Sequence, residues 1–303
     1  MDFLNQIFGA VIRFFCTLCG NNYALGILLF TVVINVVLIP LNIKQQKTTA
    51  MQARMKNKLA KLQEKYKDDR AKYQEEMGKL YSESGSSPFS GCLLMGIRLP
   101  IFLCIYTAMR ESLSFIYGAD AKLIEKAIKF LGEKKAGTMP ELYVLKNMDK
   151  LVAENAEFAK LTSGLELDFS FFGINLLDTP TSALALIWII PILSFLTSMA
   201  SSFISMAQTK KTNPGQSMGT MGCMMFGMPL FSLYIAFTVP GAVGWYWVCS
   251  NVVSTIIMVC MNKIYFPGKL IAEQEAKEAR KRRAIEQARI NPDAAGKKKG
   301  ILK

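Results

Sequence analysis

One arginine stands inside an apolar stretch of this 303-residue chain. Arg98 lies in "GCLLMGIRLPIFLCIY" (Gly91–Tyr106), whose other residues suit lipid. A guanidinium stays protonated, and at the centre of a membrane-spanning helix it costs about 2.5–3.5 kcal/mol on insertion scales. Arg98 lies roughly 10 Å along the helix from Gly91, too deep for the head groups to solvate it. It must be solvated by water in a cavity, by polar side chains, or by an anionic group that enters and leaves.

Other polar side chains fall within apolar runs and could share a site with this arginine. Thr31 and Asn35 are four residues apart, so they lie on one face of a helix. Ser250 and Asn251 follow Trp247 by about one turn in a later run. We expect these groups to add polarity near the arginine, either in a hydrated functional cavity or in a purely structural network.

A further apolar run carries several hydroxyl side chains and one amide, at Thr197, Ser198, Ser201, Ser202, Ser205 and Gln208. Serine and threonine in membrane helices often bond their own helix or a neighbouring one. The set therefore has two interpretations, helix packing or the lining of a cavity.

The composition argues against enzyme chemistry. The chain has no histidine, and the only acid inside an inferred span is Glu111, next to Arg110. Acid–base and metal catalysis thus lack their usual residues, and no GxxxxGK[ST] phosphate-binding loop occurs. Cys16 and Cys19 form a CxxC without a second pair, so we interpret them as small apolar residues. We predict no enzyme activity, no cofactor and no metal.

Long uncharged runs predict an all-α polytopic membrane protein. The chain is 51% hydrophobic, and about 20 apolar residues suffice to cross a bilayer. Pro240, Gly241 and Gly244 interrupt the last run, which we therefore interpret as two spans. The five predicted spans are 23–43, 91–117, 180–207, 218–237 and 244–264, with an outer turn at 238–243.

The first 22 residues lack the basic start of a signal peptide. Their apolar residues recur at helical spacing and include Phe3, Leu4, Ile7, Phe8, Val11, Ile12 and Phe15. We predict an amphipathic helix on the outer membrane surface over 1–22, with a sixth span as the alternative.

Lysine and arginine predict the orientation, because they concentrate in cytoplasmic loops. The formal net charge is +13, and positive charge gathers in 44–90, 208–217 and 265–303. The connection 118–179, by contrast, has eight lysines against ten acids. We predict a plasma-membrane protein with its N-terminus outside, its C-terminus in the cytoplasm, and 118–179 as an extracytoplasmic loop with helices.

Residues 44–90 have the pattern of a cytoplasmic helical hairpin. One apolar stripe contains Met51, Met55, Leu59, Leu62 and Tyr66, and a second contains Tyr73, Met77 and Leu80. The sequence "KDD" (Lys67–Asp69) between them supplies turn and capping residues. The stripes could pack on each other, or Met51, Met55, Leu59 and Met77 could contact changing apolar substrates.

The basic tail 265–303 contains a dense cluster made of Arg280, Lys281, Arg282 and Arg283. Such a cluster is typical of contact with anionic lipid head groups or with ribosomal RNA. Anionic lipids and the ribosome are therefore both candidate partners.

Three blocks of the chain resemble the YidC family (Oxa superfamily) of membrane protein insertases, in its short Gram-positive-like type. They are "GILLFTVVINVVLIPLNIKQQK" (Gly26–Lys47), Leu62–Tyr106 and "GWYWVCSNVVSTI" (Gly244–Ile256). The middle block ends with the family's landmarks at Pro88, Gly91, Cys92, Pro100, Ile101 and Phe102.

The resemblance implies a hydrophilic intramembrane groove, open to the cytoplasm and to lipid, which receives polar segments of nascent membrane proteins. It implies substrate-facing roles for Thr31 and Trp247 and makes the Sec translocon a further candidate partner. The family's groove arginine usually occupies the position of Asn35, whereas this chain carries its arginine at 98. We hypothesise that the charge has moved between helices but faces the same groove. The alternative is a secondary transporter of an organic anion that uses Arg98 as its binding cation.

Overall fold

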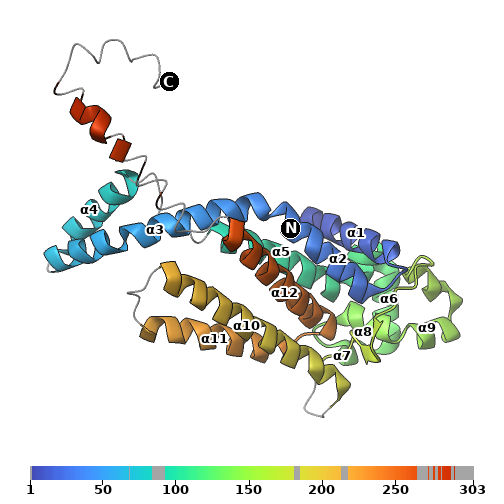
Figure 1. Cartoon of the computed structure of the whole chain (residues 1–303). Coiled ribbons are helices and arrows are strands. Elements are labelled where there is room, and N and C mark those ends of the chain that lie inside the picture. The colour runs from blue at the N-terminus through green and yellow to red at the C-terminus, as the bar shows by residue number, and fades with distance from the viewer. Residues whose placement is uncertain are drawn as a thin grey trace, which may run out of the picture. The chain divides into compact units, whose positions relative to one another are not determined.

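The computed structural model is mostly helical and divides into two compact units (Figure 1). It describes residues 2–67, 69–83, 93–180, 185–212 and 218–264, together with 272, 276, 279, 280, 282–287 and 290. The first unit comprises 1–40 and 93–258, and the second comprises 41–92 and 259–303. The first unit holds most of the helices and all of the predicted polar site.

The long helices of the first unit follow the apolar runs. They are α1 (Asp2–Leu18), α2 (Tyr23–Val37), α5 (Leu93–Arg110), the π-helix η2 (Leu113–Tyr117), the 3₁₀ turn η4 (Leu186–Trp188), α10 (Ile189–Thr212), α11 (Met218–Ala236) and α12 (Gly241–Ile264). Among the described residues, Leu186–Ala207 and Gly241–Ile264 are long and apolar enough to cross a membrane. Shorter apolar helices cover Phe3–Leu18, Tyr23–Val37 and Leu99–Arg110.

Several helix boundaries differ from the expected ones, and two of these differences have a clear physical cause. The span expected at 23–43 is interrupted at Leu38, and a new helix begins at Ile39, because Pro40 has no N–H for the Val36 carbonyl. Helix α12 begins at Gly241, three residues earlier than expected, inside the predicted turn 238–243.

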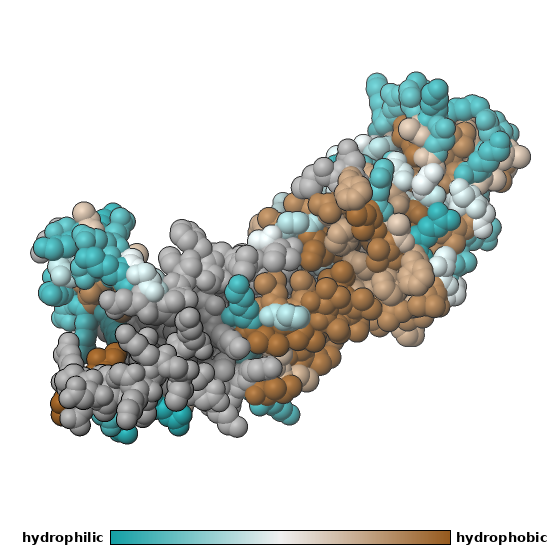
Figure 2. All heavy atoms as spheres, turned by 90° about the horizontal axis from the view of Figure 1, so that it is seen from above, coloured by the Kyte–Doolittle hydropathy of each residue, from teal (hydrophilic) through white to brown (hydrophobic). Residues whose placement is uncertain are grey.

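The first unit exposes many apolar side chains, while a few polar ones are buried within a mainly apolar core. On α2, Leu25, Leu28, Val32 and Val36 are exposed, whereas Thr31 and Asn35 face the interior. Exposed apolar side chains also line α10, α11 and α12 (Leu186, Ile189, Ile192, Leu196, Phe203, Phe226, Leu230, Phe231, Val252 and Ile256). Figure 2 shows such side chains over the middle of this unit and hydrophilic ones towards its end. This distribution suits lipid rather than water as the surrounding medium.

Helix α1 packs on α2, α5 and η2 through small residues. A Cβ at Gly26 of α2 would lie 2.6 Å from the Cys16 sulfur, and one at Gly9 would meet the Phe115 backbone. The buried positions are Asn5, Gly9, Ile12 and Cys16. Of the predicted apolar face, Ile12 is buried and Phe8, Val11 and Phe15 are partly buried, whereas Phe3, Leu4 and Ile7 are exposed. One side of α1 therefore contacts the other helices, and an apolar side is left outside.

Residues 118–180 form a compact part of the first unit, here called the cap. Its elements are α6 (Ala121–Leu131), α7 (Glu133–Ala136), α8 (Pro140–Lys146), α9 (Met148–Glu154), the 3₁₀ helix η3 (Ala156–Leu161), β1 (Ser170–Phe171) and β2 (Ile174–Asn175). Gly118 ends η2 in the left-handed conformation (φ 68°), and Asp120 then caps α6 by accepting from the Lys122 and Leu123 amides. The apolar core of the cap is continuous with that of the long helices.

Residues 168–178 of the cap, here called the clasp, join the starts of α2 and α12. The Tyr23 amide donates to the Asp168 carbonyl, and the Asp168 amide donates to the Asn21 carbonyl, both at 2.9 Å. The Gly241 and Ala242 amides donate to the carbonyls of Asp178 (2.8 Å) and Leu176 (2.7 Å). The first N–H groups of a helix have no partner within it, so these bonds supply acceptors from outside. They explain why α12 can begin at Gly241.

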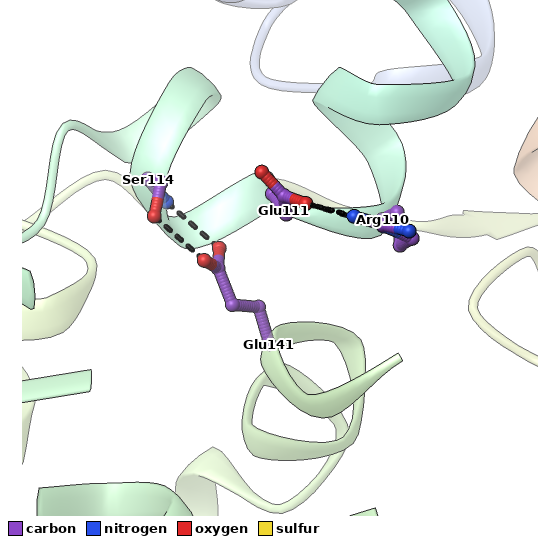
Figure 3. A network of polar contacts seen from close by, with 4 residues as sticks. All are labelled: Arg110, Glu111, Ser114 and Glu141. Carbon is purple, nitrogen blue, oxygen red and sulfur yellow. Dashed lines mark hydrogen bonds and ion pairs between the residues drawn. The ribbon is translucent and has the colours of Figure 1, made fainter. Parts of the chain in front are cut away.

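A buried carboxylate holds α8 against the end of α5 (Figure 3). Glu141 accepts hydrogen bonds from the Ser114 amide (2.9 Å) and hydroxyl (2.6 Å) at the junction between α5 and η2. Arg110 pairs with Glu111 close by. Burial raises the pKa of Glu141, the nearby Glu111 charge adds to this, and the bonds from Ser114 oppose it.

The second unit contains α3 (Ile39–Lys65, which starts in the first unit) and α4 (Arg70–Glu83). The Asp69 carboxylate accepts from the Lys72 amide, so Asp69 caps α4. The stripe residues Leu59, Leu62, Tyr66, Tyr73, Met77 and Leu80 are half-buried, whereas most of their neighbours are exposed.

We expect Glu141 to make the stability of the protein depend on pH. The folded state holds the Glu141 proton more tightly than the unfolded state, so stability should fall as the pH rises from 4.5 through the raised pKa. Glu141→Gln keeps the shape and should flatten this fall, whereas Glu141→Ala leaves the Ser114 amide unpaired and should cost about 1–3 kcal/mol. Thermal unfolding in detergent across this pH range measures both effects.

Glu157→Gln is the matched control for this titration. Glu157 is an exposed acid of the cap whose pKa is lowered by the ion pair with Lys126 (2.5 Å). The stabilisation that Glu157 contributes is present above pH 4.5 and is lost as the pH falls. Its effect on stability therefore depends on pH in the opposite direction to that of Glu141. If Glu141→Gln showed the same dependence of thermal stability on pH as the wild type, Glu141 would not be the group responsible for that dependence.

Candidate functional site

Two of the predicted site residues lie inside the first unit on α2. Thr31 is 1% exposed and Asn35 is 5% exposed. The Thr31 hydroxyl donates to the Ile27 carbonyl (2.7 Å), and the Asn35 amide donates to the Thr31 carbonyl (2.9 Å). Both donors thus bond the preceding turn of their own helix, an arrangement that lets a polar side chain face an apolar interior at little cost. The structure keeps them on one face, as their spacing predicts.

A second polar group joins α10 to α12. The Asn251 amide nitrogen lies 2.8 Å from the Ser198 hydroxyl and 3.4 Å from the Thr197 hydroxyl. One turn further along, the Thr255 hydroxyl lies 2.8 Å from that of Ser201. Asn251 and Thr255 of α12 thus form a polar ladder with three hydroxyl side chains of α10. This ladder supports the packing interpretation for Thr197, Ser198 and Ser201.

Trp247 brings α12 against α5. Its ring stacks on Phe102 with centroids 5.2 Å apart and planes 3° apart, and Phe102 in turn stacks on Tyr106. Trp247 is half-buried, so part of its surface remains open to a ligand. Ser250, also half-buried, directly precedes Asn251.

Several predicted residues cannot be placed completely. Arg98 lies in α5, but its side chain is outside the described part of the structure, and so are those of Met51 and Met55 in α3. Leu59 and Met77 are half-buried in the second unit. In the tail, Arg280, Arg282 and Arg283 are helical and exposed, and Lys281 is outside the described residues.

Two buried hydroxyls were missed by the sequence analysis. Ser112 and Ser194 are both 0% exposed, and their hydroxyls have no hydrogen-bond partner within the described residues. Ser194 precedes Thr197, Ser198 and Ser201 at helical spacing, so the serine-rich face of α10 extends one turn further than predicted. That spacing could have revealed it, whereas nothing in the sequence marks Ser112.

The arrangement can bind polar groups within an apolar surround. Among residues 2–264 that the structure describes, no group of three or more His, Cys, Asp or Glu side chains could hold a metal ion. The polar side chains described above offer hydroxyls, amides and an aromatic face, which suit hydrogen bonding and stacking rather than bond-breaking chemistry. Exposed apolar side chains, a few buried polar groups and, among the described residues, two helices long and apolar enough to cross a membrane are typical of membrane proteins.

Comparison with known proteins identifies the family. A family model described as "60Kd inner membrane protein" matches residues 14–269. "Membrane protein insertase YidC 2" of Listeria innocua is 28% identical over 292 residues, which cover 95% of this chain and 78% of the relative. "Membrane protein insertase YidC" of Pediococcus pentosaceus is 30% identical over 277 residues, covering 89% and 76%. The chain belongs to this family of bacterial inner-membrane proteins, the YidC/Oxa1 family, which is not a class of enzymes.

We expect the Asn251–Ser198 contact to contribute measurably to stability. A double-mutant cycle with Asn251→Ala and Ser198→Ala should give a coupling energy of about 0.6 kcal/mol, with an upper limit near 1.7, because interhelical hydrogen bonds in membrane proteins have this strength. Unfolding in mixed micelles provides the measurement. The control cycle pairs Asn251→Ala with Ser201→Ala, since Ser201 contacts Thr255 instead. Equal couplings in the two cycles would argue against a specific ladder.

Proposed function

We propose that this protein inserts nascent membrane proteins into the bilayer by passing their polar segments through a hydrated groove and releasing their apolar helices to lipid. The observation that carries the proposal is the match of residues 14–269 to the family, together with relatives named as membrane protein insertases. The alternative, an organic-anion transporter, gains no support from these relatives.

The proposed groove takes its walls from three helices. Helix α2 contributes Thr31 and Asn35, α5 contributes Arg98, and α12 contributes Trp247 with Ser250 and Asn251. In the present structure the α2 pair is buried and bonded to its own helix. When a polar segment of the substrate enters the groove, Thr31 and Asn35 would replace these bonds within α2 by hydrogen bonds to the backbone and side chains of that segment. When the groove closes again, the two side chains would return to the bonds within α2, so their donors stay paired.

The proposed mechanism is a lowered barrier to crossing. A polar segment would otherwise have to pass about 30 Å of hydrocarbon, where each unpaired polar group is costly. Water and polar side chains in the inner half of the membrane shorten that path. The Arg98 charge would attract acidic residues of the substrate, and burial of the substrate's apolar helix in lipid would drive its release.

We further propose the membrane topology that this mechanism needs. Helices α2, α5, α10, α11 and α12 would be the five spans, with the cap outside and residues 44–90, 208–217 and 265–303 in the cytoplasm. Lysine and arginine gather in the second unit and in the loop after α10, which supports this orientation.

The helical hairpin and the basic tail, both proposed to lie in the cytoplasm, would contact the nascent substrate and the ribosome or lipid. Met51, Met55, Leu59 and Met77 of α3 and α4 would contact nascent apolar segments. The exposed Arg280, Arg282 and Arg283, with Lys281, would bind anionic lipids or the ribosome. The Sec translocon is a further proposed partner.

The Arg98 charge is the part of the proposal most open to test. In proteoliposomes, Arg98→Gln should reduce protease-protected insertion of a small single-span protein with an acidic outer segment. We expect a loss of roughly tenfold in rate, which corresponds to about 1.4 kcal/mol of stabilisation. Arg98→Lys keeps the charge and should retain most of the activity.

Arg110→Gln is the matched control, because Arg110 lies on the same helix but is exposed and paired with Glu111. It should insert the substrate at the wild-type rate. Equal insertion by Arg98→Gln and the wild type would remove the role of the charge but leave the insertase function standing. No insertion by correctly folded wild type would refute the function itself.

A further inference from the structure

The clasp carries an exposed aromatic side chain at the tip of its hairpin. Strands β1 and β2 pair antiparallel with Phe171 opposite Ile174, so Phe172 and Gly173 form a two-residue turn. The Phe172 side chain is 86% exposed. A phenyl ring this exposed gains little from burial, although its edge contacts the neighbouring Phe171 ring.

The backbone at this tip makes phenylalanine an unfavourable choice. Phe172 has φ 49° and Gly173 has φ 77°, as a turn with two left-handed residues requires. Asparagine or aspartate followed by glycine suits such a turn, whereas a bulky residue with positive φ is strained. The sequence therefore keeps an aromatic ring where the local conformation disfavours it and where burial contributes little.

The surroundings of Phe172 connect it to the membrane-facing surface. Its ring lies 4.6 Å from that of Phe171, which lies 4.6 Å from the Trp245 ring at the start of α12. A Cβ at Gly173 would lie 3.8 Å from the exposed Leu186, at the start of the candidate span Leu186–Ala207. The aromatic cluster thus sits where two apolar helices begin, continuous with their exposed apolar side chains.

We propose that the hairpin tip is an interfacial anchor, in which Phe172 inserts into the outer leaflet between the head groups and the acyl chains. Aromatic rings are enriched at this depth of the bilayer. The anchor would hold the clasp, and through it the starts of α2 and α12, at a fixed depth relative to the outer leaflet. The proposal rests on the membrane placement of α10 and α12 given above, not on insertase activity.

The direct test places a photoactivatable benzoylphenylalanine at position 172 in liposomes that contain an alkyne-labelled phosphatidylglycerol. Phe130 of α6 is the matched control, because its ring is 55% exposed but lies on a helix bearing the ion pairs Lys126–Glu157 and Lys129–Glu125. Leu186 is the positive control at the start of a candidate span. We expect at least about fivefold more lipid adduct at 172 than at 130, and a yield near that at 186.

A yield at 172 no higher than at 130 would overturn the proposal, and so would adducts with protein in place of lipid. Wild-type insertion is measured in the same liposomes, so that the two proposals are separated. Lipid adduct without insertion leaves the anchor standing, whereas insertion without lipid adduct refutes the anchor alone.

A second measurement excludes a purely structural role for the ring. Phe172→Asn suits the positive φ, so its Tm in detergent should equal or exceed that of the wild type. Phe171→Ala removes the contact with Trp245 and should lower the Tm. In liposomes, Phe172→Asn should speed hydrogen exchange of residues 168–178 by several-fold. A Tm loss for Phe172→Asn as large as that for Phe171→Ala, or unchanged exchange, would contradict the anchor.

Discussion

The first turn of each helix presents N–H groups that its own backbone cannot satisfy, and apolar surroundings offer them few other acceptors. In this protein the cap supplies the missing partners. The carbonyls of Asp168, Leu176 and Asp178 accept from the starts of α2 and α12, while Asn22 caps α2 through the Leu25 amide. The Trp245 indole adds a bond to the Ala24 carbonyl, so α12 and α2 are also joined directly. The cap is thus part of the helical unit and not an appendage to it.

The same end of the unit is closely packed. A Cβ at Gly241 would lie 2.6 Å from the Ile187 Cδ1, and one at Gly244 would lie 2.7 Å from the Ile190 Cγ2, so a larger residue at either position would displace these side chains. At Gly26 of α2 a Cβ would meet the Cys16 backbone of α1, so only glycine fits there. Close approach through small residues stabilises membrane helices because lipid offers them no hydrophobic drive to associate. Hydrogen bonds and dense packing therefore fix the same end.

Local patterns predicted much of this architecture. Apolar runs located the helices because a membrane helix needs only length and hydrophobicity, and Asp69 could be expected to cap α4 from its position before a helical stripe. The four-residue spacing of Thr31 and Asn35 correctly placed them on one face. Asn251 was expected to add polarity near Arg98, and its contact with Ser198 of α10 was not predicted.

What could not be predicted depends on contacts between distant segments. The start of α12 at Gly241 follows from carbonyls more than 60 residues earlier, and the burial of Glu141 follows from Ser114 on another helix. Neither interaction has a signature in the local sequence.

The distribution of contacts also bears on where the unit can open. At the end held by the clasp, separating α2 from α12 would break backbone hydrogen bonds and the Trp245 contact together, each in surroundings of low dielectric. Further along, α10 and α12 are joined by side-chain contacts of Asn251 and Thr255, and Trp247 meets α5 through a ring stack. Side-chain bonds of this kind can exchange with water or with a substrate's polar groups at small net cost, because the partners remain hydrogen-bonded. A groove among α2, α5 and α12 would therefore open away from the clasp and stay closed beside it. That asymmetry is what an insertase needs in order to accept polar segments from one side of the membrane without making a continuous pore.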